Sequence, residues 1–422
     1  MPLLILSKVF ERVIAEEGSL DQIIFKSDDI GYCKTMKRLC IYVTYNKENK
    51  IKEYMGYMIK ALRECTAKLY VVCNYPKIVD GEEYVEPYVD GIFYRENKGF
   101  DAGAYKDMLC TLLGWDAVYQ YDELILMNDS FLGPFYDLNK YFDMMEETTC
   151  DFWGMTRKFP GENEVVGKYQ SHVQSYFLVF HNRVLKSEQF RSFWENFTYP
   201  ETFSEAISNY ELKINESLES YGFIPMTLTD IWGMVFAGTE NPYLFYSLEL
   251  VQDKGLPILK KKSLVIQNGG FANALKAVDF LEANDLYPTR WIWDVIDNQF
   301  YIEGYALDGM NCLEFFYKKY KKVFIYGAGV AGKNLALYFK YKGWKQEGFI
   351  VSDTEGQGAE CTLFESAPID DETGIIVSVL HQEISKEIVK YIGKRCRKDQ
   401  LFIICDCKGV RFIPEPNGKS SR

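Results

Sequence analysis

The sequence predicts an α/β protein with two sheets: a mixed, mostly parallel sheet with flanking helices, and a second, small doubly wound domain. Two observations carry this prediction. Short apolar runs alternate with amphipathic segments along much of the chain, and a glycine-rich turn restarts the alternation after residue 323. Strands that alternate with helices are typical of parallel sheets, since each crossover must return the chain to the same edge.

Composition excludes several classes of function. The 422 residues carry a formal net charge of −12, so an extended basic surface for nucleic acid is not expected. The eleven cysteines show no paired metal-ligand spacing, which argues against a zinc site and favours reduced thiols in a cytoplasmic protein. No stretch approaches the ~20 apolar residues of a membrane span, so no transmembrane segment is expected.

The first expected domain covers residues 38–255, after an N-terminal lead-in at 1–37. The apolar run from Leu124 to Met127 predicts a strand that is buried on both faces. The other patterns predict strands at 39–44, 68–73, 91–95, 150–156 and 171–180, and helices at 51–65, 105–113, 190–197 and 209–218.

Polar residues follow three of these strands, at the edge of the sheet where ligands bind in α/β folds. Gly99 and Gly103 precede a helical run, and glycines let a backbone approach a ligand closely. Asp129 follows the buried strand, where a carboxylate can hold a divalent metal against a diphosphate. The alternative for Asp129 is a purely structural role as the cap of the next turn.

The second half of the chain is expected to contain a helical connecting region at 256–310, a domain at 311–410 and a flexible tail at 411–422. The lysines at 260–262 are interpreted as part of a solvated face. In the C-terminal domain, Gly327, Gly329 and Gly332 follow a strand at 323–326, and Asp353 ends the next strand. This spacing is the dinucleotide-binding fingerprint, and the domain resembles small Rossmann-like domains that bind a nucleotide or nucleotide-sugar.

The first 250 residues resemble a GT-A-like glycosyltransferase, and in particular the rhamnan synthesis protein F family of bacterial polysaccharide-building enzymes. The resemblance covers roughly residues 38–265. It rests on four motifs in the same order: Asn97-Lys-Gly-Phe-Asp-Ala-Gly103, Tyr121-Asp122 with Asn128-Asp-Ser-Phe-Leu-Gly-Pro134, His172-Val-Gln-Ser-Tyr-Phe177, and Tyr210-Glu211 with Gly222-Phe223.

This resemblance implies roles for the residues at the strand ends. It places Asp129 where related enzymes carry an Asp-x-Asp metal motif, so that one carboxylate would hold Mg or Mn. Glu211 falls at the position of the catalytic base, although the same residue could simply complement the dipole of its helix. His172 and Gln174 are expected on the acceptor side. The expected donor-binding residues are Thr44, Tyr45, Asn46, Asn97, Gly99, Asp101, Gly103 and Asn128.

The resulting functional hypothesis is an inverting glycosyltransferase that moves a deoxyhexose, with rhamnose as one candidate, from a nucleoside-diphosphate sugar. Its expected acceptor is a saccharide or lipid-linked saccharide precursor of a bacterial surface polysaccharide, in the cytoplasm or at the inner face of the membrane. Two alternatives stay open. One is a nucleotide-sugar oxidoreductase or epimerase that uses the C-terminal glycines, and the other is a non-catalytic module that binds sugar nucleotides.

Overall fold

The computed structural model describes residues 36–78, 80–163, 166–232, 241–302, 310–353 and 361–407. From Lys37 onward these residues lie in one compact unit, Lys37–Arg422. The expected lead-in, up to residue 35, and the expected tail at 411–422 lie outside the described residues. Among the helices that are described, none is both long enough and apolar enough to cross a membrane.

Among the described residues, the larger sheet has seven strands in the order β12-β6-β11-β4-β1-β2-β3. Only β11 runs antiparallel to its neighbours β4 and β6, and the other pairs are parallel. The predicted mixed, mostly parallel sheet is therefore confirmed. Its strands are β1 (Arg38–Thr44), β2 (Lys68–Cys73), β3 (Gly91–Tyr94), β4 (Glu123–Asn128), β6 (Phe152–Gly154), β11 (Phe177–His181) and β12 (Pro225–Thr227).

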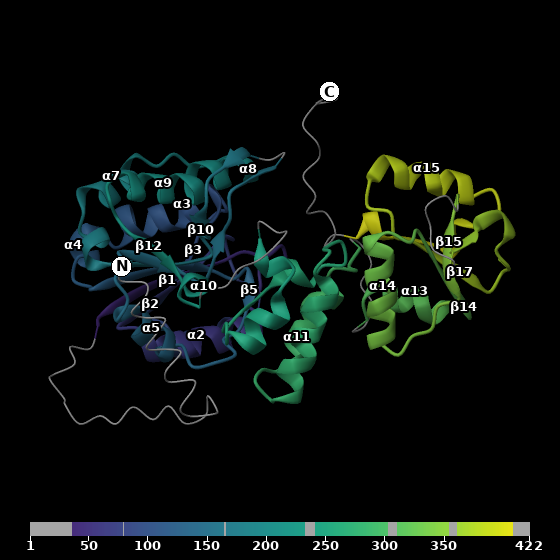
Figure 1. Cartoon of the computed structure of the whole chain (residues 1–422), viewed down its shortest axis with the longest axis horizontal. Helices are drawn as coiled ribbons and strands as arrows, with labels where there is room; N and C mark the ends of the chain where they lie inside the picture. The colour runs from purple at the N-terminus through teal and green to yellow at the C-terminus, as the bar shows by residue number, and fades with distance from the viewer. Residues whose placement is uncertain are drawn as a thin grey trace. The chain divides into compact units, whose positions relative to one another are not determined.

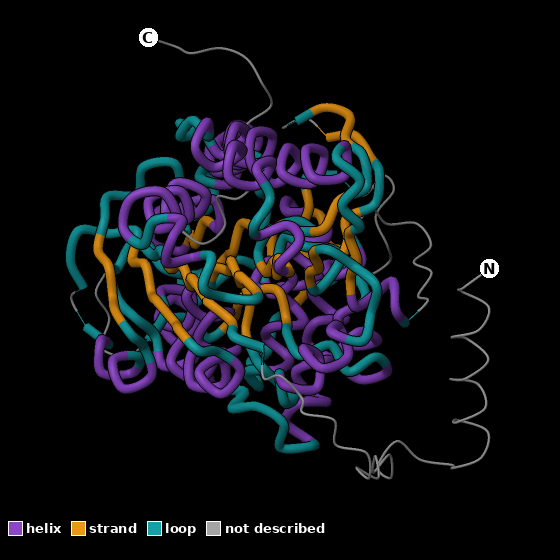
Figure 2. The backbone as a smooth tube through the Cα atoms, turned by 90° about the vertical axis from the view of Figure 1, so that its left-hand side faces the viewer, coloured by secondary structure: helices purple, strands orange, loops and turns teal. Residues whose placement is uncertain are grey.

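Helices cover both faces of this sheet, because successive residues of a strand point to opposite sides. Cys40 and Tyr42 of β1 pack in one core with helices α2 (Glu53–Cys65) and α5 (Asn139–Glu146). Leu39 and Ile41 pack in a second core on the other face. The helices of that face are α3 (Phe100–Lys106), α7 (Glu188–Asn196) and α9 (Lys213–Ser220). Figures 1 and 2 show the strands between these two helical layers.

Two of the predicted helices contain π-helical turns. The segment predicted at 105–113 consists of α3 and a π-helical stretch, η4 (Asp107–Leu112). The segment predicted at 209–218 begins in another, η5 (Ile207–Leu212), before α9 starts. π-helical turns insert an extra residue per turn and frequently occur at functional sites. Here one of them carries Glu211.

The described residues also form three short antiparallel strand pairs outside the larger sheet. The predicted strand at 171–180 is in fact two strands, β10 (His172–Val173), which pairs with β7 (Arg157–Lys158), and β11. A second pair consists of β8 (Gly161–Asn163) and β9 (Gly167–Tyr169). The third joins β5 (Phe131–Leu132) to β13 (Leu259–Lys260), which lies far along the chain. This last pairing brings the lysines at 260–262 to the end of β4.

Between residues 256 and 302 the structure contains two longer helices, α11 (Phe271–Ala283) and α12 (Arg290–Asn298), besides the short strand β13. Their apolar faces share a core with the first helices of the C-terminal domain. The remaining short helices are α4 (Trp115–Val118), α6 (Asn182–Leu185), α8 (Phe203–Ala206), α10 (Leu228–Ile231), η2 (Glu82–Tyr84), η3 (Glu86–Tyr88), η6 (Pro242–Leu244), η7 (Glu249–Asp253) and η8 (Lys261–Leu264).

The C-terminal sheet has five parallel strands in the order β16-β15-β14-β17-β18. The chain therefore starts in the middle, builds outward to one side and then reverses, which is the strand order of a dinucleotide-binding half. Helices pack in cores on both faces, so the predicted doubly wound domain is confirmed. Its elements are β14 (Lys322–Tyr326), β15 (Gly348–Val351), β16 (Cys361–Leu363), β17 (Thr373–Val377), β18 (Leu401–Ile403), α13 (Cys312–Lys319), α14 (Val330–Tyr341), α15 (Gln382–Ile392), η9 (Phe364–Ser366), η10 (Lys398–Gln400) and η11 (Ile404–Asp406).

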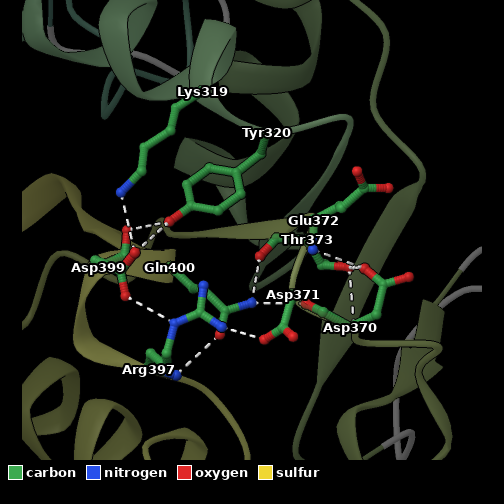
Figure 3. A network of polar contacts seen from close by, with 9 residues as sticks. All are labelled: Lys319, Tyr320, Asp370, Asp371, Glu372, Thr373, Arg397, Asp399 and Gln400. Atoms are coloured by element: carbon green, nitrogen blue, oxygen red, sulfur yellow. Dashed lines mark hydrogen bonds and ion pairs between the residues drawn. The ribbon is translucent and has the colours of Figure 1, made fainter.

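A polar network ties together the starts of these strands (Figure 3). The Asp399 carboxylate accepts hydrogen bonds from Lys319 Nζ at 3.0 Å and Tyr320 OH at 3.1 Å. Gln400 Nε2 donates to the carbonyl oxygens of Asp370 and Thr373 at 2.7 and 2.8 Å. Since all five strands are parallel, this network lies at the edge opposite the glycine-rich turn, and its role is structural.

Candidate active site

The donor side of the candidate site lies where β1 and β4 end. These strands are adjacent and parallel, with Val43 opposite Asn128, so the residues after them are neighbours in space. Thr44 Oγ1 lies 3.3 Å from Asp129 Oδ2 and donates to it. Asn128 Nδ2 donates to Asp101 Oδ2 at 2.7 Å. The structure therefore brings together four of the predicted donor-side residues.

Lys261 completes the surroundings of Asp129. Its Nζ lies 3.3 Å from Asp129 Oδ2 and donates to Tyr54 OH at 2.7 Å. The side chains of Lys261 and Asp129 are only 22% and 15% exposed. Although burial opposes the charge of Lys261, the nearby Asp129 carboxylate raises the pKa of Lys261 above its ordinary value.

Lys260 lies on the same edge of the sheet. Its Nζ donates to Ser130 Oγ at 2.8 Å and sits 3.6 Å from the centre of the Tyr176 ring. Burial is the main reason that the pKa of Lys260 falls to about 7, and the neighbouring lysines lower it further. The expectation of a solvated face for the triplet is therefore wrong for Lys260 and Lys261, and only Lys262 is exposed.

The residues around Asp129 do not form a metal site by themselves. Asp129 Oδ2 is already contacted by the Thr44 hydroxyl and the Lys261 ammonium group. The neighbouring carboxylate of Asp101 is hydrogen-bonded to Asn128. In the described part of the chain, no three His, Cys, Asp or Glu side chains gather as metal ligands. This donor set does not fit the divalent metal that the sequence resemblance implies.

Asp101 lies at the start of α3 and is the most perturbed acid of the donor side. Burial raises its pKa to about 6, with a smaller contribution from the negative charge of Asp129 and an opposing one from the Asn128 hydrogen bond. Two carboxylates with little solvent between them repel each other. A ligand group that carries a positive charge or donates a hydrogen bond would therefore stabilise the ionised Asp101.

The loop before α3 is shaped by internal contacts. Arg95 Nη2 donates to the Lys98 carbonyl oxygen at 2.7 Å and holds the loop in place. A Cβ on Gly103 would come within 2.2 Å of the same carbonyl, and Gly99 has a φ of +75° beside the Tyr199 ring. Both glycines are thus required by the shape of the loop itself.

An open cavity of about 430 Å³ borders this loop and is lined by residues 96–100 and 199–201. Asn97 is one of the lining residues, and its Oδ1 is shielded from solvent without a hydrogen-bond donor among the described residues. Buried polar atoms are usually paired with protein or ordered water, so a water or a ligand group is expected to donate to this oxygen. Asn97 thus borders the cavity with an acceptor atom that no described residue pairs.

The other predicted donor residues lie just after β1. Tyr45 is 44% exposed, which leaves its ring available for a flat ligand surface. Asn46 instead closes a local turn, because its side chain accepts from Lys50 N at 3.0 Å and donates to the Lys50 carbonyl at 2.5 Å. The Asn46 side chain is thus engaged in holding the backbone of residues 46–50.

Glu211 is held by two residues of the β10–β11 segment, Ser175 and His172. Ser175 Oγ donates to Glu211 Oε2 at 2.5 Å, and Ser175 N donates to the same oxygen at 3.3 Å. His172 Nε2 lies 3.3 Å from Glu211 Oε1. Burial opposes ionisation, but the hydrogen bonds from His172 and Ser175 outweigh it and lower the pKa of Glu211 to about 2. Glu211 is therefore a carboxylate at every physiological pH, with 20% of its side chain exposed.

The two predicted acceptor-side residues lie next to Glu211 but have internal partners. His172 is buried between Glu211 and the carbonyl oxygen of Gln170, which lies 2.9 Å from Nδ1. Gln174 is buried as well, and its Oε1 accepts from Thr156 Oγ1 at 3.2 Å. Asn215 joins the two segments because it hydrogen-bonds both Val173 and the Glu211 carbonyl.

Lys260 connects the donor side with Glu211. It hydrogen-bonds Ser130, next to Asp129, and Glu211 is the strongest charged influence on its pKa. Asp101 acts on Lys260 in the same direction. Glu211 is thus close enough to Lys260 to act on its charge, and Lys260 in turn contacts the residue after Asp129. The sequence could indicate this proximity only through the order of the motifs.

The glycine-rich turn of the C-terminal domain lies at the carboxyl end of β14, where the strand order reverses. Gly327 has a φ of +100°, and Gly329 precedes the first turn of α14. A Cβ on Gly332 would meet the Gly327 carbonyl oxygen at 2.0 Å, so the third glycine permits close packing of helix on strand. Asp353 follows β15, the neighbouring strand.

Comparison with solved structures gives distant likenesses. Core-mannan synthase A from Aspergillus fumigatus, in its Mn/GDP form, is 10% identical with a TM-score of 0.28, over 46% of this chain and 72% of that chain. The mannosyltransferase Ktr4p from S. cerevisiae in complex with GDP is 8% identical with a TM-score of 0.26, over 46% of this chain and 68% of that chain.

Comparison of sequences gives a family. Residues 69–323 match the family model described as rhamnan synthesis protein F, which is well over half of the chain. Virulence protein VirA from Vibrio anguillarum (strain ATCC 68554 / 775) is 27% identical over 217 residues, 45% of this chain and 67% of VirA. The uncharacterized protein y4gN from Sinorhizobium fredii (strain NBRC 101917 / NGR234) is 26% identical over 157 residues, 36% of this chain and 38% of y4gN.

Proposed function

The chain belongs to the rhamnan synthesis protein F family and is a glycosyltransferase by that membership, and we propose that it transfers a deoxyhexose with inversion from a nucleoside-diphosphate sugar. The observation that carries this proposal is Glu211, a carboxylate that His172 and Ser175 hold in place and that acts on Lys260, the residue in contact with Ser130 beside Asp129. A base and a diphosphate site on opposite sides of a sugar are what a single inverting displacement needs.

On the donor side, the edge formed by Thr44, Asn128 and Asp129 takes the diphosphate. Hydroxyl and amide groups at the carboxyl ends of parallel strands point away from the sheet toward a ligand in this fold class. The exposed ring of Tyr45 and the unsatisfied oxygen of Asn97 lie on segments that flank this edge. They are suited to the flat base and the ribose hydroxyls of a nucleotide.

On the acceptor side, Glu211 removes the proton from the attacking hydroxyl. The acceptor oxygen forms a bond to the anomeric carbon while the bond to the diphosphate oxygen breaks, and the electron pair leaves with the diphosphate. His172 and Ser175 orient the carboxylate and keep it ionised. A pKa of about 2 makes Glu211 a weak base before substrate binds. The acceptor hydroxyl therefore has to displace a donor such as the Ser175 hydroxyl, which restores basicity.

The family description, rhamnan synthesis, supports a deoxyhexose such as rhamnose as the donor sugar. The proposed acceptor is a saccharide, or lipid-linked saccharide, precursor of a bacterial surface polysaccharide. The described cysteines are all free thiols, which supports a reaction in the cytoplasm. The C-terminal domain is proposed to bind a nucleotide or nucleotide-sugar at Gly327, Gly329 and Gly332, with Asp353 on the ribose. The strand order around that turn supports this role.

A thermal-shift panel tests the proposed function. A ligand that binds only the folded protein raises its melting temperature by mass action. We expect at least one of UDP, GDP and dTDP, or its rhamnose conjugate, to raise the melting temperature in a way that depends on Asn128 and Asp129. If the shift is instead seen with nicotinamide dinucleotides alone, and survives in an Asp129→Ala variant, the glycosyltransferase assignment of this site is wrong.

A further inference from the structure

Lys260 and Lys261 contact Ser130 and Asp129 at the strand end where a donor's diphosphate is expected, and we propose that these two lysines take the place of a divalent cation in binding the diphosphate and stabilising it as it leaves. This inference rests on the proposed function, because it assigns the chemistry of the same donor site. It is carried by the contacts of the two ammonium groups, which come from β13 and the turn that follows it.

Lys261 lies beside the Asp129 carboxylate at a position that a metal ion would otherwise take. Its Nζ is 3.3 Å from Asp129 Oδ2, and Thr44 Oγ1 approaches the same oxygen at 3.3 Å. A cation bound at that oxygen would have to displace the ammonium group or lie against it, with strong repulsion in a site shielded from water. Asp129 is thus arranged to orient Lys261 toward the ligand.

Lys260 lacks a carboxylate partner of its own in the parts of the chain that the structure describes. Its Nζ is in contact with the Ser130 hydroxyl and the face of the Tyr176 ring. An ammonium group that is largely removed from water is costly unless an anion compensates it. A second ammonium group, that of Lys261, comes from the next residue, which adds to the cost. The pair is accordingly suited to an anion with two charges, such as a diphosphate.

The pairing of β13 with β5 positions these two lysines. β5 and β13 pair with Leu259 opposite Leu132 and Lys260 opposite Phe131, and Lys261 N donates to the Ser130 carbonyl at 3.1 Å. Tyr54, from α2, restricts the Lys261 side chain, because its hydroxyl oxygen accepts a hydrogen bond from Lys261 Nζ at 2.7 Å. Backbone pairing and a side-chain hydrogen bond thus restrict both ammonium groups before any ligand binds, which reduces the entropy lost on binding.

In the transfer step, the bond from the anomeric carbon to the diphosphate oxygen breaks and that oxygen receives the electron pair. The acceptor hydroxyl supplies the new bond to carbon, and its proton goes to Glu211. The two ammonium groups donate hydrogen bonds to the diphosphate and neutralise the charge that develops on it. Positioned positive groups at a leaving oxygen act in this way in many transfer reactions.

Isothermal titration calorimetry with UDP, GDP and dTDP, in EDTA and in Mn²⁺, tests the proposal. We expect the preferred nucleotide to bind in EDTA, with an affinity that Mn²⁺ changes by less than about threefold. Lys260→Met and Lys261→Met should each weaken binding by about tenfold or more, because a charge-assisted hydrogen bond is lost. Lys261→Arg should retain most of the affinity, and the exposed Lys262→Met is the matched control that should bind like the natural protein.

Three results would overturn the inference. The first is binding that is lost in EDTA and restored by Mn²⁺, and the second is unchanged affinity in both methionine variants when their circular dichroism spectra match that of the natural protein. The third is a lack of binding by every nucleotide in both EDTA and Mn²⁺, which would overturn the proposed function together with this inference. The first two results leave the proposed function standing.

Discussion

Lys261 Nζ lies 3.3 Å from Asp129 Oδ2, although the two residues are 132 positions apart in the chain. The antiparallel pairing of β5 with β13 produces this contact. The contact changes the role proposed for Asp129. Its carboxylate holds the ammonium group of Lys261, so Asp129 positions a lysine that is proposed to bind the diphosphate. The same edge was expected to present Asp129 to a divalent metal.

Replacing Asp129 with alanine should lower the rate of sugar transfer by ~10²-fold or more. The change removes the partner that orients Lys261 and the carboxylate that accepts from Thr44, so the departing diphosphate is less well stabilised. Steady-state turnover with a saturating donor is the measurement. Asp116, an exposed acid at the start of α4, provides a matched control. Full activity in Asp129→Ala would remove this residue from the site.

Replacing Glu211 with glutamine should leave nucleotide binding within about twofold and reduce turnover by ~10²-fold or more, since general base catalysis contributes that much. The amide keeps the shape of the side chain but cannot accept the proton of the acceptor. Glu216→Gln is the control, because Glu216 lies one turn further along and forms an exposed pair with Lys213. Calorimetry and turnover are measured on the same preparations, and normal turnover would place the base elsewhere.

The pKa of Glu211 also predicts how stability depends on pH. Because the folded pKa of about 2 lies below the ordinary value, the ionised form stabilises the native state above about pH 4.5, and this contribution is lost as the pH falls toward 2. The difference in unfolding free energy between the natural protein and Glu211→Gln should therefore shrink from about pH 6 to about pH 3 in urea titrations. A constant difference over this range would mean that His172 and Ser175 do not stabilise the carboxylate.

Lys260 is expected to lower the stability of the folded protein, although it is proposed to contribute to ligand binding. Burial lowers its folded pKa to about 7, so the unfolded chain binds more protons between about pH 7 and 10.5. The buried charge therefore lowers the unfolding free energy by its full amount below about pH 7, and this loss disappears as the pH rises from about 7 to about 10.5. Lys260→Met should therefore raise the melting temperature at neutral pH, with a gain that shrinks toward pH 10. A lower melting temperature at pH 7 would contradict this prediction.

In the C-terminal domain, Gly332→Ala should destabilise the protein by about 2 kcal/mol or more, because the added methyl group would lie 2.0 Å from the Gly327 carbonyl oxygen. Gly329→Ala is the matched control, since no heavy atom lies within 4 Å of the added Cβ. Denaturant unfolding monitored by tryptophan fluorescence measures both. Equal stability of the two variants would show that the glycine-rich turn relaxes without cost.

Much of the fold could be predicted from the sequence because its strands are short apolar runs with clear limits. The strand predicted at 68–73 is β2 with the same bounds, and the buried run at 124–127 extends by one residue on each side in β4. The π-helical turn at Glu211 was not predicted, because local apolar spacing indicates a helix but not the extra residue in one turn. The division of the 171–180 strand into β10 and β11 depends on pairing with β7, which is a tertiary contact.

The candidate site could be predicted only where its residues follow strands in sequence. Thr44, Asn128 and Asp129 meet because β1 and β4 are adjacent, and a parallel sheet makes that arrangement expected. The pattern of three basic residues in a row is typical of an exposed face, so it predicts the two lysines to be solvent-exposed. Leu259, the apolar residue before them, is compatible with a short strand, but it does not reveal that the partner strand lies more than a hundred residues away.

The measurement that most directly tests the proposed reaction is the anomeric configuration of the first sugar product, followed by proton NMR from the moment of mixing enzyme with the donor that the thermal-shift panel selects. A single displacement assisted by Glu211 predicts a product whose configuration is opposite to that of the donor, with formation that fails in Glu211→Gln. A product that retains the donor's configuration, or forms equally fast without the Glu211 carboxylate, would contradict an inverting transferase that uses Glu211 as its base.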